Sequence, residues 1–340
     1  MGVTIKDIAA MANVSRGTVD KVLNHRPGVK KETQEKVLKI VKEMNYQPNF
    51  LGKALVQSKD PLKLGIILTP DYNPYIQEIL KGIENGRAEY SAFGIKIITK
   101  ILTTLDPLEQ LSMIKELVNE GVQGLAVFPL NNARIINYLN SLAEQGIALI
   151  TFNSKVLGCN DLCFIGQNHY KGGRTAASLM GRICSSGGSV GVIISSMHLS
   201  CHQDRLIGFR EKMQEDYPDI QIVEIQKNQD RSETAFHITA SYLEKYPNLQ
   251  GIYLTGGGIF GVGNALKEHG NSSKVHVICH DVVANTIELL SNGTVDFAIG
   301  QNPTQQGYLL VKTLFEYLIK RQVPEKFIEI PIQIFTDETV

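Results

Sequence analysis

The strongest constraint on the fold is a regular alternation of short apolar runs and amphipathic helical segments that begins near residue 63. One series of strands and helices occupies 64–152, and a second of similar size runs from about 168 to 280. Alternating strands and helices build a parallel sheet with helices on both faces. We therefore predict an α/β fold with two doubly wound parallel-sheet lobes and a ligand site between them, at the carboxyl ends of the strands.

The first 50 residues have a different, all-helical pattern. Thr4 and Asp7 have the spacing of a capping box and predict the start of a short helix. Ser15 is a suitable N-cap for a second helix at 16–23, and a third is expected at 31–45. Two short helices joined by a tight turn form a helix-turn-helix. The sequence therefore predicts a small all-α head on the α/β body.

The charge of the chain divides between these two parts. The formal net charge is zero, with 34 basic and 34 acidic residues. Residues 1–60 nevertheless hold eleven Lys and Arg against six Asp and Glu, a net of +5, so the remaining 280 residues carry −5. A compact basic head is typical of a protein that binds a polyanion. A solvated helical face, or a helical cap on an enzyme, is the alternative interpretation.

Other features predict a cytoplasmic protein that binds neither a membrane nor a metal. The five cysteines are scattered, with no CxxC pair, as in reduced proteins, and no apolar run is long enough for a signal peptide or a membrane span. His198, Cys201 and His202 match no standard zinc spacing, and the glycines at 185–189 and 256–258 fit no phosphate-binding motif. We predict no cofactor and no catalytic residues.

Several spaced motifs in the head carry a family resemblance. They are Val3-Thr-Ile-Lys-Asp-Ile-Ala, Ala12-Asn-Val-Ser-Arg-Gly-Thr-Val, Val22-Leu-Asn, Thr33-Gln-Glu-Lys-Val and Asn45-Tyr-Gln-Pro-Asn. Together they resemble the N-terminal region of the lactose-repressor/galactose-repressor (LacI/GalR) family of bacterial transcription regulators. The body, from 62 to 335, resembles the type I periplasmic sugar-binding fold and is nearest in pattern to ribose-binding proteins.

The resemblance to that family implies a set of DNA-binding residues. Arg16 and Gly17 match the base-reading positions that begin the recognition helix, and Lys21 matches a third, one turn further on. Thr18 and Asn24 match positions that contact phosphate, and Leu55 matches a leucine that enters the minor groove from a hinge helix at 50–57. The implied set is completed by Thr4, Ser15, Asn49 and Lys53.

Two departures from the family pattern affect how the head would read DNA. Gly17 has no side chain, and Asp20 replaces a usual Ser and would repel a nearby phosphate. Base reading is therefore expected to fall to Arg16 and Lys21, because a long cationic side chain can donate to guanine.

The resemblance also implies an effector site at the strand ends of the body. Its members are polar or apolar residues that match sugar-contacting positions: Asn73, Tyr75, Ile76, Asn153, Arg205, Asp281 and Gln301. Amides, a carboxylate and a guanidinium suit adjacent hydroxyls because each can hold two. Asn153 stands where a carboxylate is usual, and Gly256–Gly258 replaces an Asn-Asp pair, which suggests a roomier pocket. A sugar, a polyol or a sugar phosphate remains open as the effector.

These observations predict three segments: a helix-turn-helix domain at 1–48, a hinge helix and linker at 49–61, and an effector-binding and dimerisation domain at 62–340. Crossings near Gly166, Gly300 and Arg321 would divide the last into lobe 1 (about 62–165 and 301–321) and lobe 2 (about 166–300 and 322–340). We predict a homodimer that binds double-stranded operator DNA and represses carbohydrate genes under control of a small-molecule effector. A sugar-binding transport protein and a sugar-modifying enzyme are the rival hypotheses.

Overall fold

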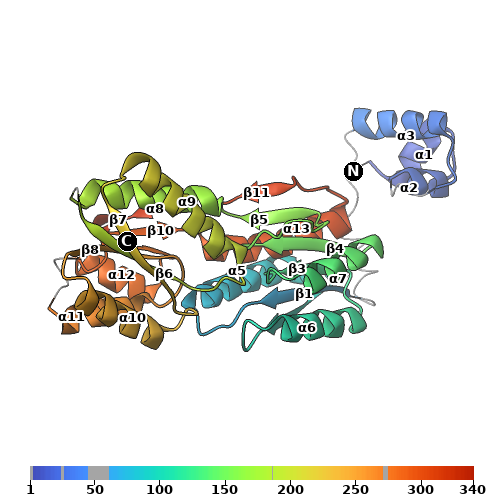
Figure 1. The fold of residues 1–340 in the computed structure, drawn as a ribbon. Helices are drawn as coiled ribbons and strands as arrows, with labels where there is room; N and C mark the ends of the chain where they lie inside the picture. The colour runs from blue at the N-terminus through green and yellow to red at the C-terminus, as the bar shows by residue number, and fades with distance from the viewer. Residues whose placement is uncertain (1–2, 24–26, 45–60, 186, 271–274) are drawn as a thin grey trace.

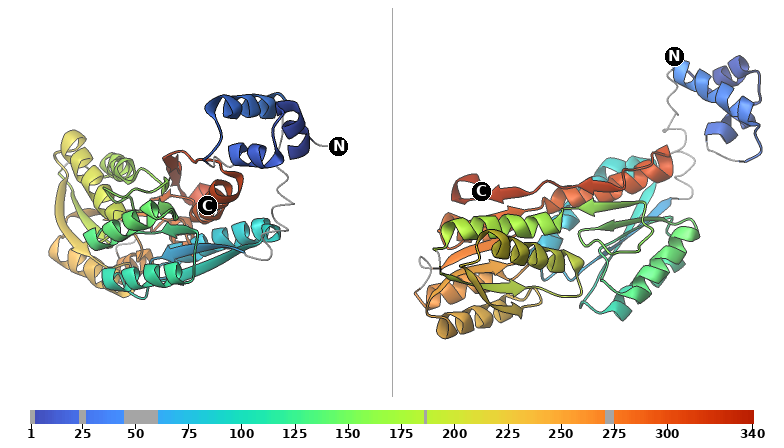
Figure 2. Two further views of the ribbon diagram at one scale, coloured as in Figure 1. Left: turned by 90° about the vertical axis from the view of Figure 1, so that its right-hand side faces the viewer. Right: turned by 45° about the horizontal axis from the view of Figure 1, so that its top comes forward.

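The computed structural model describes residues 3–23, 27–44, 61–185, 187–270 and 275–340. Residues 3–44 form a small helical head, and residues 61–340 form two lobes, each built on a six-stranded sheet (Figures 1 and 2). This is the predicted α/β architecture with a helix-turn-helix head. Within the described ranges, no helix combines the length and the apolar character needed to cross a lipid bilayer.

The head consists of α1 (Ile5–Ala12), α2 (Arg16–Leu23) and α3 (Lys31–Glu43). The predicted capping box is present at the start of α1: the Thr4 amide donates to the Asp7 carboxylate over 2.9 Å, and the Thr4 hydroxyl accepts from the Asp7 amide. Seven apolar side chains close a core of their own: Ile8, Ala9, Ala12, Val19, Val22, Val37 and Ile40. Three short helices are thus held together by one small hydrophobic cluster.

Lobe 1 contains an all-parallel sheet in the order β11-β5-β4-β3-β1-β2. Its strands are β1 (Leu62–Leu68), β2 (Ile95–Ile101), β3 (Gly124–Val127), β4 (Ala148–Phe152), β5 (Cys163–Gly166) and β11 (Phe327–Glu329). Its helices are α5 (Pro74–Tyr90), α6 (Pro107–Asn119), α7 (Ala133–Glu144) and α13 (Pro303–Phe315), with short turns η1 (Ser91–Phe93) and η2 (Glu316–Lys320). The central strands are buried along nearly their whole length, as parallel strands covered on both faces must be.

Lobe 2 repeats this plan with the order β12-β10-β9-β8-β6-β7. Its strands are β6 (Ser189–Ile194), β7 (Gln221–Lys227), β8 (Leu249–Leu254), β9 (His276–His280), β10 (Phe297–Gly300) and β12 (Gln333–Phe335), of which β12 is antiparallel. Its helices are α8 (His169–Ile183), α9 (Ser200–Asp216), α10 (Ser232–Lys245), α11 (Ile259–Glu268) and α12 (Ala284–Ser291), and a turn, η3 (Asp337–Thr339), follows β12. The eight elements from α8 to β9 correspond to the series predicted at 168–280, whereas α12 and β10 lie beyond it.

The chain passes between the lobes after β5, after β10 and between β11 and β12. The predicted third crossing near Arg321 is wrong. Strand β11 still belongs to lobe 1, where Phe327 pairs with Phe164, and only β12 enters the sheet of lobe 2. The sequence alone indicates one strand-like run at 328–335, because two three-residue strands are too short to show separate hydrophobic periods. The second half of lobe 1 therefore extends to Glu329.

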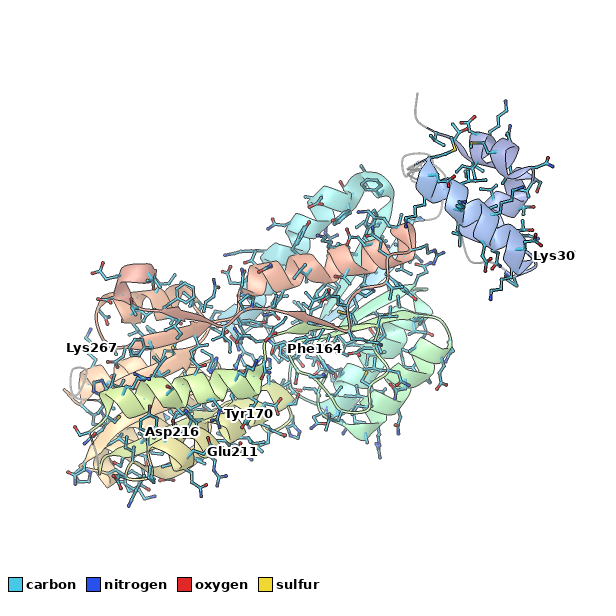
Figure 3. All side chains as sticks on the ribbon, turned by 90° about the horizontal axis from the view of Figure 1, so that it is seen from above. Lys30, Phe164, Tyr170, Glu211, Asp216 and Lys267 are labelled. Carbon is cyan, nitrogen blue, oxygen red and sulfur yellow. The ribbon has the colours of Figure 1, made fainter. Side chains whose placement is uncertain are left out.

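Two helix pairs, α8 with α9 and α5 with α13, pack backbone to backbone at glycines. A Cβ atom on Gly173 would lie 2.0 Å from the carbonyl oxygen of Arg205 in α9, and one on Gly82 would lie 1.9 Å from that of Thr304. On the solvent side, the Tyr170 hydroxyl of α8 donates to the Glu211 carboxylate of α9 over 2.6 Å (Figure 3). The first of these contacts fixes Arg205 against the start of lobe 2.

The close approach of α8 and α9 gives a testable stability prediction. Gly173→Ala should lower the free energy of unfolding by about 1–3 kcal/mol, because the new methyl group overlaps a backbone carbonyl. Lys171→Ala, at an exposed position of the same helix, is the matched control and should be close to neutral. Urea unfolding measures both. Because alanine by itself favours a helix over glycine, an unchanged or raised stability of the Gly173 variant would contradict the packing described here.

Candidate ligand-binding cleft and DNA-binding surface

Helix α2 turns its cationic side chains away from the core of the head. Val19 and Val22 are buried, whereas Arg16, Gly17 and Lys21 are exposed on the opposite side. This follows from the helical spacing of the sequence, since residues three and four apart share a face. Helix α2 therefore presents an open face with Arg16 in its first turn and Lys21 in its last.

Hydroxyl groups cap the two helices of the helix-turn-helix. The Ser15 hydroxyl accepts from the amide of Thr18 over 3.0 Å and lies 2.9 Å from the Thr18 hydroxyl, while Thr4 caps α1. Asn13 between the helices takes a left-handed conformation, with φ 55°, which makes the turn tight. The other predicted DNA-binding residues lie outside the described part of the chain, as does the predicted hinge helix: Asn24, Asn49, Lys53 and Leu55.

In the body, four of the predicted effector residues form one chain of hydrogen bonds. The Asn153 amide nitrogen donates to the Tyr75 hydroxyl and, over 3.4 Å, to the Gln301 oxygen. The Gln301 nitrogen in turn donates to Asp281 over 2.6 Å. All four side chains are buried. Asn153, Asp281 and Gln301 directly follow β4, β9 and β10, and Tyr75 lies in the first turn of α5. The structure therefore joins residues of both lobes in one place.

An unusual backbone conformation orients two of these side chains. Asn153 follows β4 and Asp281 follows β9, and both take left-handed conformations, with φ 56° and 71°. Such conformations are costly for residues other than glycine and collect at functional sites. Burial raises the pKa of the Asp281 carboxyl, and the neighbouring positive charge of Arg205 opposes that shift.

Arg205 is the most unusual member of the predicted site. Its side chain is only 1% exposed, and one guanidinium nitrogen, Nη1, donates to the Thr255 carbonyl over 2.7 Å. Its Nε and Nη2 atoms are buried and have no hydrogen-bond partner among the described residues. A buried cation with unused donors is expensive, so this arrangement points to a ligand that supplies acceptors.

The other two predicted residues have different positions. Asn73 caps α5, where its side-chain oxygen accepts from the Tyr75 amide over 3.0 Å, and it also lines a cavity. Ile76 is fully buried within the hydrophobic core of lobe 1. The structure therefore places Asn73 at the cleft, whereas Ile76 packs with the core beneath it.

Three buried histidines lie near Arg205, and none of them was predicted as an effector-binding residue. His169 Nε2 contacts the Asn153 carbonyl, His202 Nδ1 lies 3.2 Å from the Thr255 carbonyl, and His280 Nε2 lies 2.8 Å from the Tyr253 hydroxyl. Burial lowers the pKa of all three, to about 4 for His202, and the charge of Arg205 adds to the effect. The sequence did contain one indication that His280 belongs to the site, since it directly precedes Asp281 at a strand end.

The glycine run after β8 does not leave the empty space that the sequence suggested. A Cβ atom on Gly256 would lie 2.4 Å from His202 Cε1, and one on Gly257 would lie 3.0 Å from Asp230. The Asp230 carboxylate also accepts from the Gly257 amide over 2.6 Å. The room gained by the glycines is therefore partly filled by His202 and Asp230, which enter from neighbouring elements.

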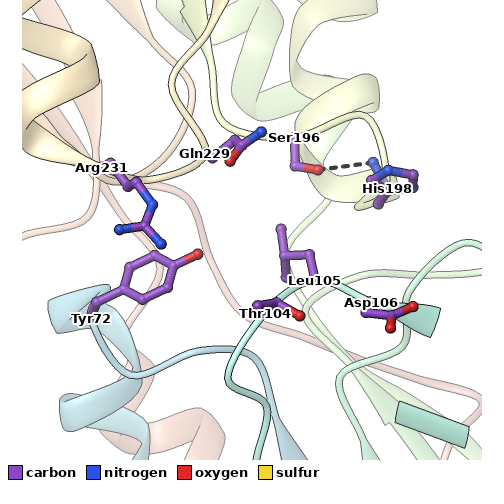
Figure 4. Close-up of a pocket in the computed structure, with 8 residues that line it drawn as sticks. All are labelled: Tyr72, Thr104, Leu105, Asp106, Ser196, His198, Gln229 and Arg231. Atoms are coloured by element: carbon purple, nitrogen blue, oxygen red, sulfur yellow. Dashed lines mark hydrogen bonds between the residues drawn. The ribbon is translucent and has the colours of Figure 1, made fainter. Parts of the chain in front are cut away.

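Two of the cavities between the lobes are adjacent to each other. The inner cavity, of about 130 Å³, is bordered by Asn73, Asp230, Gly257, His280, Asp281 and Thr286, among others. The outer cavity, of about 280 Å³, is more open to solvent, and Figure 4 shows the residues that line it. Tyr72 borders both cavities. The described residues contain no group of three or more His, Cys, Asp or Glu side chains placed to hold a metal ion.

The lobes contact each other on both sides of these cavities. The Asn131 amide of lobe 1 donates to the His198 carbonyl of lobe 2 over 2.8 Å, and the hydroxyls of Ser154 and Ser200 lie 2.8 Å apart. Across the mouth, the Arg231 guanidinium lies 5.0 Å from the ring centre of Tyr72. The structure therefore represents a closed arrangement of the two lobes.

The fold and the cleft define a two-lobed ligand-binding protein with a helix-turn-helix head. Comparison with family models agrees: residues 64–322 match the periplasmic binding protein domain, and residues 4–49 match bacterial regulatory proteins of the lacI family. The chain belongs to the periplasmic binding protein domain family, and its head is that of the lacI family.

Individual relatives match smaller parts of the sequence. The HTH-type transcriptional regulator MalR of Streptococcus pneumoniae is 35% identical over 131 residues, covering 37% of this chain and 38% of that protein. The ribose operon repressor of Haemophilus influenzae is 26% identical over 212 residues, covering 62% and 60%. The chain thus spans less than two thirds of the length of these relatives.

One solved structure illustrates the match of the body. The glucose-galactose binding protein GanP from Geobacillus stearothermophilus superposes with a TM-score of 0.75 at 19% identity, covering 82% of this chain and 98% of that one. At this level of identity the likeness shows the fold alone.

The three buried histidines predict a pH dependence of stability. Their folded pKa values are lowered, so the unfolded chain binds more protons below about pH 6.5, and stability falls as the pH falls. Between pH 7.0 and 5.5, each histidine should cost about 1 kcal/mol of unfolding free energy. His280→Gln should reduce that loss by about one histidine's share, whereas exposed His237→Gln should leave it unchanged. Denaturant unfolding at both pH values measures this, and equal pH dependence in all three proteins would contradict the prediction.

Proposed function

We propose that this protein is a DNA-binding transcription regulator, a repressor of carbohydrate genes, whose operator affinity is controlled by a small molecule bound between the lobes. The observation that carries this proposal is one chain that joins an exposed basic helix to a closed cleft, where a buried arginine has two donor nitrogens without partners among the described residues. Relatives named as a transcriptional regulator and an operon repressor support the same conclusion.

In this proposal the head binds double-stranded operator DNA. Arg16 and Lys21 read bases in the major groove from the exposed face of α2, and Gly17 lets the backbone approach closely. Phosphate contacts and minor-groove contacts come from the remaining members of the implied set, which are Thr4, Ser15, Thr18, Asn24, Asn49, Lys53 and Leu55. A homodimer would place two such heads in successive major grooves, and its partner, chromosomal DNA, implies a cytoplasmic location.

The effector site uses the hydrogen-bonded chain from Tyr75 to Asp281 together with Arg205. The unused donors of Arg205 hold ligand oxygens, while Asn153, Asp281 and Gln301 fix adjacent hydroxyls. Asn73 lines the cleft, and Ile76 supports Tyr75 from the core. A sugar or a similar polyhydroxylated molecule fits this mixture of donors and acceptors better than an apolar ligand.

Lobe closure connects the two sites. Ligand contacts that exist only when both sheets meet favour the closed arrangement, and the three chain crossings transmit the movement of one lobe against the other. Because the coupling free energy is reciprocal, operator binding must change effector affinity by the same factor. Typical couplings of about 1–3 kcal/mol correspond to a roughly 5- to 150-fold change in affinity.

The DNA-binding proposal predicts the effect of removing a base-reading side chain. An operator selected from a random palindromic library by the full chain provides the probe. Arg16→Ala and Lys21→Ala should each weaken binding to it by roughly 5- to 150-fold and lower the salt dependence of the affinity. Lys39→Ala, at an exposed lysine of α3, removes the same charge from another face and should have a much smaller effect. Unchanged affinity in the α2 variants would refute this role for the helix.

The effector site predicts the effect of removing Arg205. In calorimetric titrations with pentoses, hexoses, disaccharides and sugar phosphates, the ligand that binds the parent protein should lose at least about 100-fold in affinity with Arg205→Ala, because charge-assisted hydrogen bonds are lost. Arg210→Ala, at an exposed position of the same helix, is the matched control. Asp281→Asn preserves side-chain volume and should also weaken binding. Parental affinity in both cleft variants would show that the ligand binds elsewhere.

A further inference from the structure

The outer cavity is built from four loops that follow strands of both lobes. Tyr72 follows β1 and Leu105 follows β2 in lobe 1, while Ser196 follows β6 and Gln229 and Arg231 follow β7 in lobe 2. In Figure 4 the Tyr72 hydroxyl and the Leu105 side chain point into the space from below, and Ser196 and Gln229 border it from above. The cavity is thus formed only when the two lobes meet.

The volumes show that the inner cavity is small for a complete ligand site. Pockets that bind small molecules usually enclose about 300–1,000 Å³. The inner cavity has about 130 Å³ and the outer one about 280 Å³, and Tyr72 is common to both. Only the combined volume of the two cavities falls within the usual range for a small-molecule pocket. A ligand anchored near Asp281 can therefore extend past Tyr72 toward the mouth of the cleft.

The lining of the outer cavity is suited to a hydroxylated ring. Tyr72 and Leu105 offer apolar surface, which a sugar ring can cover with its C–H face. Among the described residues, the side chains of Gln229 and Arg231 donate no hydrogen bond to the protein, and the Ser196 hydroxyl, which accepts from the His198 amide over 3.1 Å, keeps its proton to donate. These groups provide a polar edge opposite an apolar face.

The loop that carries Gln229 and Arg231 is held in place. Asn228 donates through its amide to the Gly257 carbonyl over 2.7 Å, and Asp230 accepts from the Gly257 amide over 2.6 Å. Gln229 and Asp230 both take left-handed conformations, with φ 53° and 61°. Two adjacent residues in this costly conformation persist only because surrounding contacts fix them. The polar edge of the outer cavity is therefore preorganised.

The charges that border the outer cavity favour a neutral occupant. Arg231 is basic, but its guanidinium lies over the Tyr72 ring, and the Asp106 carboxylate is part of the same lining. Asp106 also caps α6 by accepting from the Leu108 amide over 2.9 Å. A phosphate group in this cavity would be close to that carboxylate, and like charges repel.

We propose that the outer cavity is a subsite for a second neutral, hydroxylated ring, so that the effector is a disaccharide or a glycoside. The proposal rests on the proposed function and narrows the effector classes that the sequence left open. A monosaccharide would fill the inner cavity alone and make no contact with Gln229 or Arg231. A two-ring ligand would contact both lobes at the mouth and add to the closure contact between Tyr72 and Arg231.

Calorimetry on the full chain tests this proposal with neutral disaccharides (maltose, lactose, cellobiose, melibiose and sucrose), their component monosaccharides, and glucose 6-phosphate. One disaccharide should bind at least tenfold more tightly than either of its components. Arg231→Ala and Gln229→Gly should weaken that disaccharide at least fivefold and change monosaccharide affinity less than twofold. Glycine is chosen because it accepts the left-handed conformation at this position. Lys227→Ala, at an exposed end of β7, is the control.

The remaining outcomes separate this proposal from the function on which it rests. The second-ring subsite would be overturned if a monosaccharide bound as tightly as every disaccharide and neither variant changed sugar affinity. The proposal of a sugar-responsive regulator would then still stand. Tightest binding by glucose 6-phosphate, lost with Arg231→Ala, would overturn it in favour of a phosphate subsite. If no sugar in the panel binds or alters binding to the selected operator, both the subsite and the proposed sugar response fail.

Discussion

The burial of Arg205 is the constraint on which the cleft depends. Its backbone carbonyl lies against Gly173 where α8 and α9 approach closely. Its guanidinium donates to the Thr255 carbonyl and has two nitrogens without partners among the described residues. Burying a charge without full hydrogen bonding costs on the order of several kcal/mol. Acceptors from a ligand offset this cost only where the surrounding side chains already exclude water. Ligand binding and lobe closure are therefore linked by the same group.

The charge of Arg205 also determines the state of its neighbours. It helps to keep His169, His202 and His280 neutral by lowering their pKa values. Because His169 Nε2 faces the Asn153 carbonyl, that nitrogen carries the proton, and the buried Nδ1 atom is left as an acceptor without a partner in the described structure. The cleft thus offers unused donors on Arg205 beside an unused acceptor on His169. Hydroxyl groups, which donate and accept at once, match this pair better than a purely anionic group does.

Much of the architecture could be predicted because long parallel-sheet elements leave a clear hydrophobic pattern, and capping residues such as Thr4 and Ser15 mark helix starts. The third crossing between the lobes could not be predicted, because β11 and β12 have only three residues each. The sheet to which each strand belongs is decided by tertiary pairing. The cleft histidines were overlooked for a related reason. His280 adjoins Asp281 at a strand end, but its burial, like that of His169 and His202, depends on neighbours far away in the chain.

The glycine run at 256–258 departs from the family pattern of two polar side chains. Polar side chains from other elements occupy the space beside these glycines. Without side chains there, His202 approaches from α9 and Asp230 from the loop after β7, and Asp230 is held by the Gly257 amide. Side chains at Gly256 and Gly257 would push this loop away. The same loop carries Gln229 and Arg231 to the outer cavity. The glycines after β8 and the polar edge at the cleft mouth are therefore parts of one local arrangement, in which the Gly257 amide holds the loop that carries Gln229 and Arg231.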